Sequence, residues 1–287
     1  MQNSLNEVKR VLDSNKKIVL MLAPSFVAEF NYPDILIYLK KAGFDKLVEL
    51  TFGAKIINKK YHKILECSNC FLISSVCPGI VSIIKKEYSQ FIKNLIPVLS
   101  PMVATARLCK KIYPNHKILF ISPCNFKKVE ALENKDCVDF VLDYQELRLL
   151  LSTFKINPDK QIKNSKEKIL HFDKFYNDYT KIYPLAGGLS KTAHIKGILA
   201  KEQTKIIDGI LKVKTFLNNP NKKVKFLDCN FCKGGCIGGP SLSPNKSLSQ
   251  KKKKILAYVE KARHEKIPST DKGILRRAEG IRLTKKY

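Results

Sequence analysis

The stretch KVKFLDCNFCKGGCIGGP, residues 223–240, joins an apolar strand pattern to a loop of cysteines and glycines. Three of the nine cysteines of the chain fall in this loop, at Cys229, Cys232 and Cys236. Glycine lets a backbone approach another group closely because it has no Cβ, and thiolates bind zinc, copper(I) and iron–sulfur clusters. We interpret the loop as a metal site. The alternative is a glycine-rich turn whose free cysteines are buried as small apolar side chains.

The chain of 287 residues is long enough for one large domain or two lobes. No apolar run approaches the ~20 residues that span a bilayer, and residues 1–17 lack the apolar region of a secretory signal. An odd number of cysteines without such a signal disfavours a disulfide framework. We therefore expect a cytoplasmic protein that does not bind membranes.

The formal net charge of +28 is the most extreme bulk property of the sequence. The lysines are spread along the whole chain, and no recognisable nucleic-acid module accompanies them, so we expect no nucleic-acid partner. An acidic protein partner is a further possibility, because complementary charge raises the rate of encounter, and composition alone does not decide among these explanations. A lysine-rich composition shared by the whole proteome is an explanation that the sequence leaves open.

Apolar strand patterns alternate with helical patterns along the chain. The run KKIVLMLAP at 16–24 suits a strand buried on both faces of a parallel sheet. Further strands are predicted at 46–50, 71–74, 117–122, 140–143 and 223–228, and helices at 33–42, 54–66, from 78, 102–113, 127–134, 144–154, 202–217 and 249–265. This alternation predicts an α/β fold of two lobes with mostly parallel sheets flanked by helices. The expected boundaries are lobe one at 16–154, a loop at 155–181, lobe two at 182–248, and a basic helix and tail at 249–287.

Two further cysteines occupy equivalent places in this pattern. Cys77 follows the strand predicted at 71–74, and Cys124 follows the strand at 117–122. Each lies at the carboxyl edge of a predicted parallel strand, where α/β proteins bind their ligands. Together with Cys232 and Cys236 they make four thiolates, the number that a four-iron cluster needs.

The remaining cysteines carry less weight. Cys67 and Cys70 form a C-x-x-C motif at the start of a strand, and its two interpretations are a metal or redox role and ordinary burial. We interpret Cys109, on a helix face, and Cys137, in a turn, as structural. Cys229 is interpreted as the end of its strand, although it could serve as a spare ligand.

Several of these motifs, in this order, resemble the catalytic domain of iron-only (FeFe) hydrogenases. The resemblance spans residues 16 to 275. It is carried by LAPS at 22–25, FGA at 52–54, SSVCPG at 74–79, SP at 100–101, SPCNFKK at 122–128, DFVLDYQEL at 139–147, AGGLSKTA at 186–193 and CKGGCIGGP at 232–240. The SPM at 100–102 and the GGLSKTA segment look closer to the divergent, sensory-type branches of the family.

The resemblance implies two α/β lobes with a metal cluster in the cleft between them. Four cysteines would bind a 4Fe-4S cluster, and one of them, Cys236, would also bridge to a diiron subcluster that carries carbonyl, cyanide and a bridging dithiolate. Together these groups form the H-cluster, and its ligands would be Cys77, Cys124, Cys232 and Cys236. Lys127 would donate a hydrogen bond to a cyanide; its alternative interpretation is a solvated lysine at a helix start. Ala23, Pro24 and Ser25 would form a turn that packs against the diiron site.

Three positions depart from the family pattern. Val76 stands where a cysteine usually passes protons to the diiron site, and Ser122 stands where a methionine usually packs near the cluster. The helix that usually supplies glutamates reads KIINKKYHKIL at 55–65 and has no carboxylate. Since a positioned acid or base contributes roughly 10²–10⁴-fold to a rate, the sequence predicts slow turnover or another proton route.

The leading hypothesis is a minimal hydrogenase that interconverts protons and molecular hydrogen, favouring hydrogen evolution with electrons from an acidic ferredoxin or a similar carrier. Since no ferredoxin-like cluster motif is found, electrons are expected to enter at the cubane. H-cluster maturation proteins are the other partners expected. The alternatives are a hydrogen sensor with little turnover and an iron–sulfur assembly factor.

Overall fold

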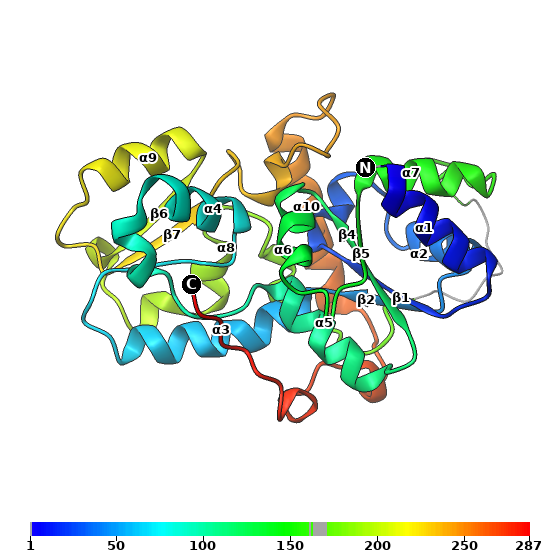
Figure 1. The fold of residues 1–287 in the computed structure, drawn as a ribbon, viewed down its shortest axis with the longest axis horizontal. Helices are drawn as coiled ribbons and strands as arrows, with labels where there is room; N and C mark the ends of the chain where they lie inside the picture. Colours follow the sequence, from blue (N-terminus) through cyan, green and yellow to red (C-terminus); the bar gives the residue numbers. More distant parts are fainter. Residues whose placement is uncertain (1, 161, 163–170) are drawn as a thin grey trace.

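Two parallel β-sheets form the frame of the molecule, which the computed structural model describes for residues 2–160, 162 and 171–287 (Figure 1). The first sheet has four parallel strands in the order β2-β1-β4-β5. They are β1 (Ile18–Leu22), β2 (Lys46–Glu49), β4 (Lys117–Ser122) and β5 (Phe140–Asp143). The second sheet has three parallel strands in the order β3-β7-β6. They are β3 (Leu72–Ile73), β6 (Thr204–Asp208) and β7 (Phe226–Asn230).

Both faces of the first sheet are buried, which is why β1 reads as an unbroken apolar run. Ile18, Leu20 and Leu22 point into a core shared with α1 (Gln2–Asp13), α2 (Asp34–Lys41), α7 (Tyr144–Thr153) and α10 (Leu248–His264). Val19 and Met21 point into a second core shared with α3 (Thr51–Glu66) and α5 (Pro101–Ile112). The strand therefore buries every side chain between two helical layers.

The second sheet has its own small core beneath α4 (Pro78–Glu87) and α9 (Ile210–Asn218). The core on the α3 and α5 side of the first sheet nevertheless includes Phe226 of β7. Because one apolar core includes strands of both sheets, the two lobes pack as a single unit, and α3 runs from the middle of the molecule beneath the second lobe (Figure 1).

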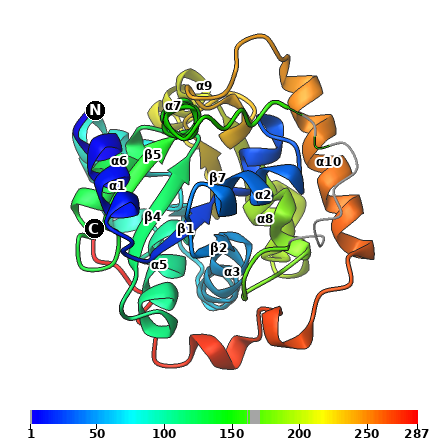
Figure 2. The same ribbon diagram turned by 90° about the vertical axis from the view of Figure 1, so that its right-hand side faces the viewer.

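Shorter helices and α10 complete the connections. Figure 2 shows α10 running along one side of the molecule, where it packs on three 3₁₀ helices, η1, η3 and η6. Ser247 caps α10 in a capping box with Gln250. The other α-helices are α6 (Phe126–Leu132) and α8 (Gly188–Thr192), and the 3₁₀ helices are η1 (Pro24–Ala28), η2 (Ser89–Asn94), η3 (Tyr179–Ile182), η4 (Ile195–Gly197), η5 (Lys201–Gln203), η6 (Cys236–Gly238), η7 (Ser269–Asp271) and η8 (Leu275–Ala278).

Several expected segments differ from the structure. The helix expected at 202–217 is wrong for its first half, because residues Thr204–Asp208 form β6 along β7. Gly209, with φ of +92°, then turns the chain into α9. Helix α1 was not expected at all. Strand β3 and helix α4 fall inside the 16–154 range expected for the first lobe, yet β3 pairs with β7 in the second sheet.

The segment expected as a polar loop at 155–181 contains buried residues near its end. Residues 161 and 163–170 lie outside the described part of the chain. Phe172 and Phe175 are fully buried in the two cores of the first sheet. Lys181 is also fully buried, where its ammonium bonds Glu49. The end of this segment therefore packs its side chains against the first sheet.

Candidate metal centre

The four cysteines predicted as ligands line one cavity at the carboxyl ends of the strands. Cys77 is the N-cap of α4, four residues beyond β3. Cys124 lies two residues beyond β4, and Cys232 lies two residues beyond β7. Cys236 begins η6 in the same loop as Cys232. The cavity therefore gathers one cysteine from the first sheet and three from the second.

Close backbone contacts hold the two loops that carry Cys124 and Cys236. The amide of Cys236 donates to the carbonyl of Pro184 at 2.7 Å. Gly235 has φ of +76°, and a Cβ there would lie 2.6 Å from the same carbonyl oxygen. A Cβ on Gly239 would lie 2.4 Å from the carbonyl oxygen of Pro123. These glycines are required because the Cys236 loop touches the backbone of residues 184–186 at one point and the backbone of the Cys124 loop at another.

Ser122 shapes the turn that presents Cys124. Its hydroxyl accepts a hydrogen bond from the amide of Cys124 and donates one to the carbonyl of the same residue, both at 3.0 Å. Serine and threonine hydroxyls commonly close such local turns. The serine that departs from the family pattern thus has a local structural role.

Burial raises the pKa of three of the four thiols. The pKa of Cys232 rises to about 12, and the pKa values of Cys124 and Cys236 are also raised, first by burial and then by the charges of neighbouring cysteines. Protein atoms surround Cys236 on most sides. Its accessible surface faces the cavity, so the thiol is both exposed to the cavity and enclosed by the protein. Four thiolates would repel one another here, so a cationic metal must replace their protons.

Lys127 lines the same cavity at the start of α6. Its ammonium donates to Glu130 Oε2 at 2.7 Å, and its side chain is 14% exposed. The neighbouring Lys128 instead bonds both carboxylate oxygens of Glu146, each at 2.7 Å. Of these two adjacent lysines, only Lys127 is therefore positioned to meet an anionic group in the cavity.

The turn at Ala23, Pro24 and Ser25 forms another wall of the cavity. It follows β1, and η1 begins at Pro24. The hydroxyl of Ser25 lies 2.6 Å from the hydroxyl of Tyr144, and both groups are buried. All three residues expected to pack against a bound cofactor thus lie at the cavity.

The structure also places on the cavity wall Asp228, a residue that was expected only as part of the strand at 223–228. Asp228 lies on the cavity wall four residues before Cys232. The only signal for it in the sequence is an acidic residue after an apolar strand and directly before the cysteine loop. Val76 lies on the wall as expected from its place beside Cys77.

The other five cysteines do not line the cavity. Cys67 and Cys70 are exposed, and the buried ones are Cys109, Cys137 and Cys229. In the described part of the chain, no three His, Cys, Asp or Glu side chains converge tightly enough for one metal ion. A cubane spreads its ligands more widely, because each cysteine binds a different iron, so the four cysteines suit a cluster better than a single ion.

Comparisons with known proteins give the family. The model of the C-terminal domain of the iron-only hydrogenase large subunit matches residues 16–240. Iron hydrogenase 1 of Clostridium pasteurianum is 23% identical over 323 residues, an alignment that covers 90% of this chain and 56% of that protein. The cytosolic Fe-S cluster assembly factor NAR1 of Kluyveromyces lactis is 35% identical over 89 residues, or 30% of this chain and 19% of that protein. The chain thus spans little more than half the length of the Clostridium protein.

Solved structures share the fold. The FeFe-hydrogenase HydA1 from Chlamydomonas reinhardtii superimposes with a TM-score of 0.65 at 17% identity, covering 96% of this chain and 90% of that one. HydA(deltaEFG), a second FeFe-hydrogenase structure, gives a TM-score of 0.63 at 16% identity with the same coverage. With most of its length matched by the family model, the chain belongs to the iron-only hydrogenase family, as a form of the C-terminal domain of the large subunit.

Proposed function

We propose that this chain is a minimal iron-only hydrogenase that reversibly reduces protons to molecular hydrogen. The observation that carries the proposal is the shared cavity of four cysteines and Lys127. Thiolates are the ligands of iron–sulfur clusters, and the ammonium of Lys127 on the same wall suits an anionic ligand such as cyanide.

The residues present fit an H-cluster. Cys77, Cys124, Cys232 and Cys236 would hold a 4Fe-4S cluster, and Cys236 would also hold the diiron subcluster. When bound, the H-cluster supplies the redox and hydrogen-binding chemistry, and the protein supplies ligands, orientation and electrostatics. Lys127 would turn from Glu130 toward a cyanide, and the apolar turn at 23–25 would exclude water from the reacting side.

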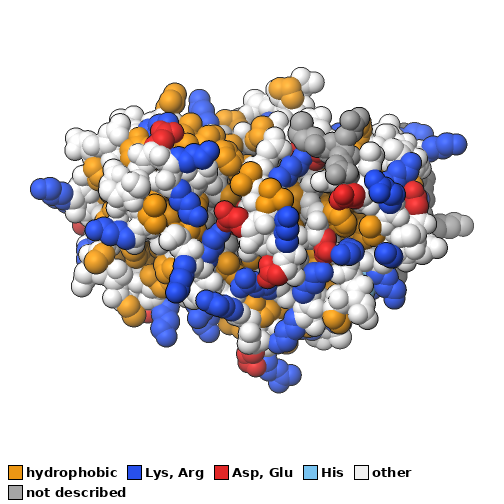
Figure 3. All heavy atoms as spheres, in the orientation of Figure 1, with side chains coloured by type: hydrophobic (Ala, Val, Ile, Leu, Met, Phe, Trp, Pro, Cys, Tyr) orange, Lys and Arg blue, Asp and Glu red, His pale blue; other side chains and the backbone are white. Residues whose placement is uncertain are grey.

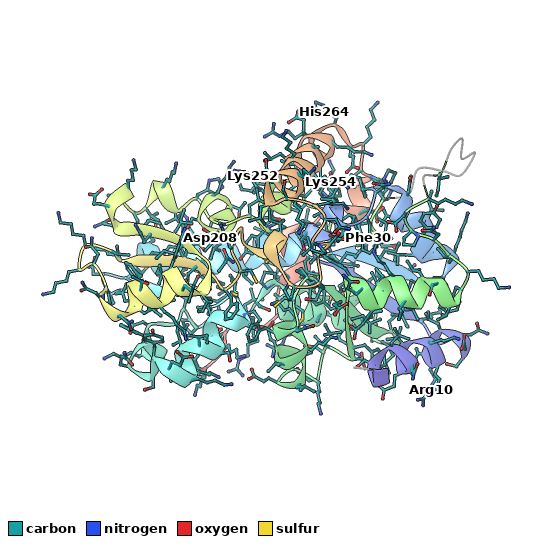
Figure 4. All side chains as sticks on the ribbon, turned by 90° about the horizontal axis from the view of Figure 1, so that it is seen from above. Arg10, Phe30, Asp208, Lys252, Lys254 and His264 are labelled. Atoms are coloured by element: carbon teal, nitrogen blue, oxygen red, sulfur yellow. The ribbon has the colours of Figure 1, made fainter. Side chains whose placement is uncertain are left out.

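We further propose an acidic ferredoxin-type carrier as the electron donor. Lysine and arginine side chains are spread over the face in Figure 3, with few acidic ones among them. Lys233 lies inside the ligand loop and is exposed. Helix α10, which packs on η6, carries the exposed Lys252 and Lys253, and Figure 4 labels Lys252 and Lys254 on this helix. A negative partner would be attracted to the side of the molecule where the cysteine loop lies.

Maturation proteins would insert the diiron subcluster. Within the described residues, no helix has the length and apolarity to cross a bilayer. We place the enzyme in the cytoplasm, where such carriers and maturation proteins act.

The test is anaerobic infrared spectroscopy of protein loaded with the diiron cofactor, with hydrogen evolution from reduced methyl viologen assayed on the same sample. Carbonyl and cyanide bands together with hydrogen are expected. Bands without hydrogen would instead favour a hydrogen sensor. A cubane without bands would refute the hydrogenase function and favour the assembly-factor alternative, which the local similarity to NAR1 supports.

Lys127→Met separates the two parts of the site. Among the described residues, the ammonium of Lys127 bonds Glu130 and forms no hydrogen bond to a cysteine. K127M is therefore expected to keep the iron content of the cubane. It should lose most of the diiron bands, since an anionic ligand would lie unpaired against methionine. Lys128→Met is the matched control, because Lys128 bonds Glu146 away from the cavity. Equal diiron bands in both variants would exclude a cofactor contact for Lys127.

A further inference from the structure

Asp228 is the one carboxylate among the described residues that line the cavity. It is 2% exposed, and its Oδ2 accepts hydrogen bonds from the amide of Ser190 at 3.0 Å and from its hydroxyl at 2.7 Å. Within the described part of the chain it forms no ion pair. The titratable groups that face it are Tyr61, Tyr183 and Cys229, all uncharged near neutral pH.

The buried position of Asp228 favours its protonated form. Burial raises the pKa of this carboxyl above its ordinary value, and the hydrogen bonds from Ser190 offset only part of the rise. A carboxyl whose pKa is raised toward the working pH can both give and take a proton. Asp228 can therefore exchange a proton at the cavity wall, which the side chain of Val76 cannot do.

Two buried polar atoms, one of them near Asp228, have no hydrogen-bond partner among the described residues. One is the hydroxyl of Tyr183, on the cavity wall, and the other is Asn58 Oδ1 on α3. Tyr183 lies near Asp228 and Cys236, since their charges contribute to its raised pKa after burial. Buried polar atoms are nearly always bonded to protein or to water, so these two atoms mark positions for water.

Further polar groups lie along the seam between α3 and α8, the helix that also carries Ser190. Ser190 bonds Asp228, and two residues farther along α8 Thr192 accepts a hydrogen bond from Asn58 Nδ2 at 2.8 Å. His62, one turn beyond Asn58 on α3, lies 2.9 Å through Nδ1 from the carbonyl of Ala193 and is partly exposed. This seam therefore supplies hydroxyl, amide and imidazole groups.

We propose that Asp228 carries protons between the cavity and the seam in this chain. The proposal rests on the hydrogenase function above. In each passage the carboxylic acid of Asp228 releases a proton toward the cavity and becomes a carboxylate. The hydroxyl of Ser190 then gives its proton to the carboxylate and takes one from seam water, which regains it from bulk solvent. One proton moves inward per passage, two passages serve one hydrogen molecule, and the two electrons come separately from the ferredoxin-type donor.

The first test does not need the diiron cofactor. Infrared difference spectra between wild type and Asp228→Asn, each with the cubane alone at neutral pH, are expected to contain a protonated-carboxyl band. That band should shift in deuterated water, and Asp228→Glu should keep a similar band. Asparagine can still accept the bonds from Ser190, so D228N is expected to keep its fold and iron content. Absence of the band would overturn the role of Asp228, whatever the rate of the wild type.

The second test compares hydrogen evolution in the loaded proteins. D228N is expected to lose about 100-fold or more with carbonyl and cyanide bands unchanged, and D228E should recover much of the rate. A fully loaded D228N with wild-type turnover would overturn the proposal. A loaded wild type that evolves no hydrogen would instead overturn the hydrogenase function, while the infrared band still decides whether Asp228 holds an exchangeable proton.

Discussion

Gly239→Ala is the sharpest test of how the two cysteine loops are held together. The new Cβ would lie 2.4 Å from the carbonyl oxygen of Pro123, at least 0.6 Å inside the 3.0 Å below which real contacts essentially never fall. Gly239 has φ of −63° and ψ of 155°, which alanine adopts freely. The whole effect of the substitution is therefore the collision between the Cys236 loop and the Cys124 loop.

The backbone must move apart by more than a metal site tolerates. Ligand distances in such sites are held to about ±0.2 Å, and neither the Cβ, whose position the backbone fixes, nor the carbonyl oxygen of Pro123 can rotate away. We expect G239A to cost about 1–3 kcal/mol of folding free energy, as overpacked positions do. G239A should nevertheless bind much less of the iron–sulfur cluster than wild type, even under conditions where the variant remains folded.

The assay measures iron content, sulfide content and visible absorption after anaerobic reconstitution. Thermal unfolding of the cluster-free protein is measured separately. Gly197→Ala is the matched control, because nothing lies within 4 Å of a Cβ at Gly197 and its φ is not positive. G197A is expected to bind four irons. If G239A also bound four irons with wild-type stability, contact between these loops would not hold the site.

Three further outcomes follow from the packing. Lys181→Met leaves the carboxylate of Glu49 buried without its ammonium partner at 2.7 Å, so we expect a loss of about 3–5 kcal/mol. Burial raises the pKa of Glu49 even with this partner and should raise it further without it, so the loss should grow as the pH rises through the raised pKa that Glu49 has in the wild type, and urea unfolding of K181M and the K181M/E49Q pair would measure it. Burial tends to raise the pKa of Asp139, but hydrogen bonds from two lysines and a backbone amide hold that pKa below its ordinary value. D139N should therefore be less stable than wild type at neutral pH. The difference in unfolding free energy between the two proteins should narrow as the pH falls below 3.8, which the same urea assay would measure. Val76→Cys puts a thiol on the cavity wall, and adding it to D228N should raise the rate of hydrogen evolution about tenfold above that of D228N alone. An unchanged rate in V76C/D228N would show that this wall does not conduct protons.

Local patterns were sufficient for much of the fold. Strand β4 and strand β5 have the predicted bounds, because an apolar run between turn signals is a property of neighbouring residues. The edge strand β6 was missed, because its Lys205 and Ile206 are exposed and its strand character comes from pairing with β7. Strand β3 has only two residues, and only its partner Phe226–Leu227, more than 150 positions away, places it in the second sheet.

The same division applies to the site. The sequence alone predicted the four cysteines, Lys127 and the turn at 23–25 as site residues, because each belongs to a short motif of adjacent residues, and the structure brings all of them to one cavity. Only the tertiary structure decided that Asp228 lies on the cavity wall, bonded to Ser190 from another element and close to the unpaired hydroxyl of Tyr183. Burial and hydrogen-bond partners arise when distant segments pack, and no local pattern of residues records which segments those are.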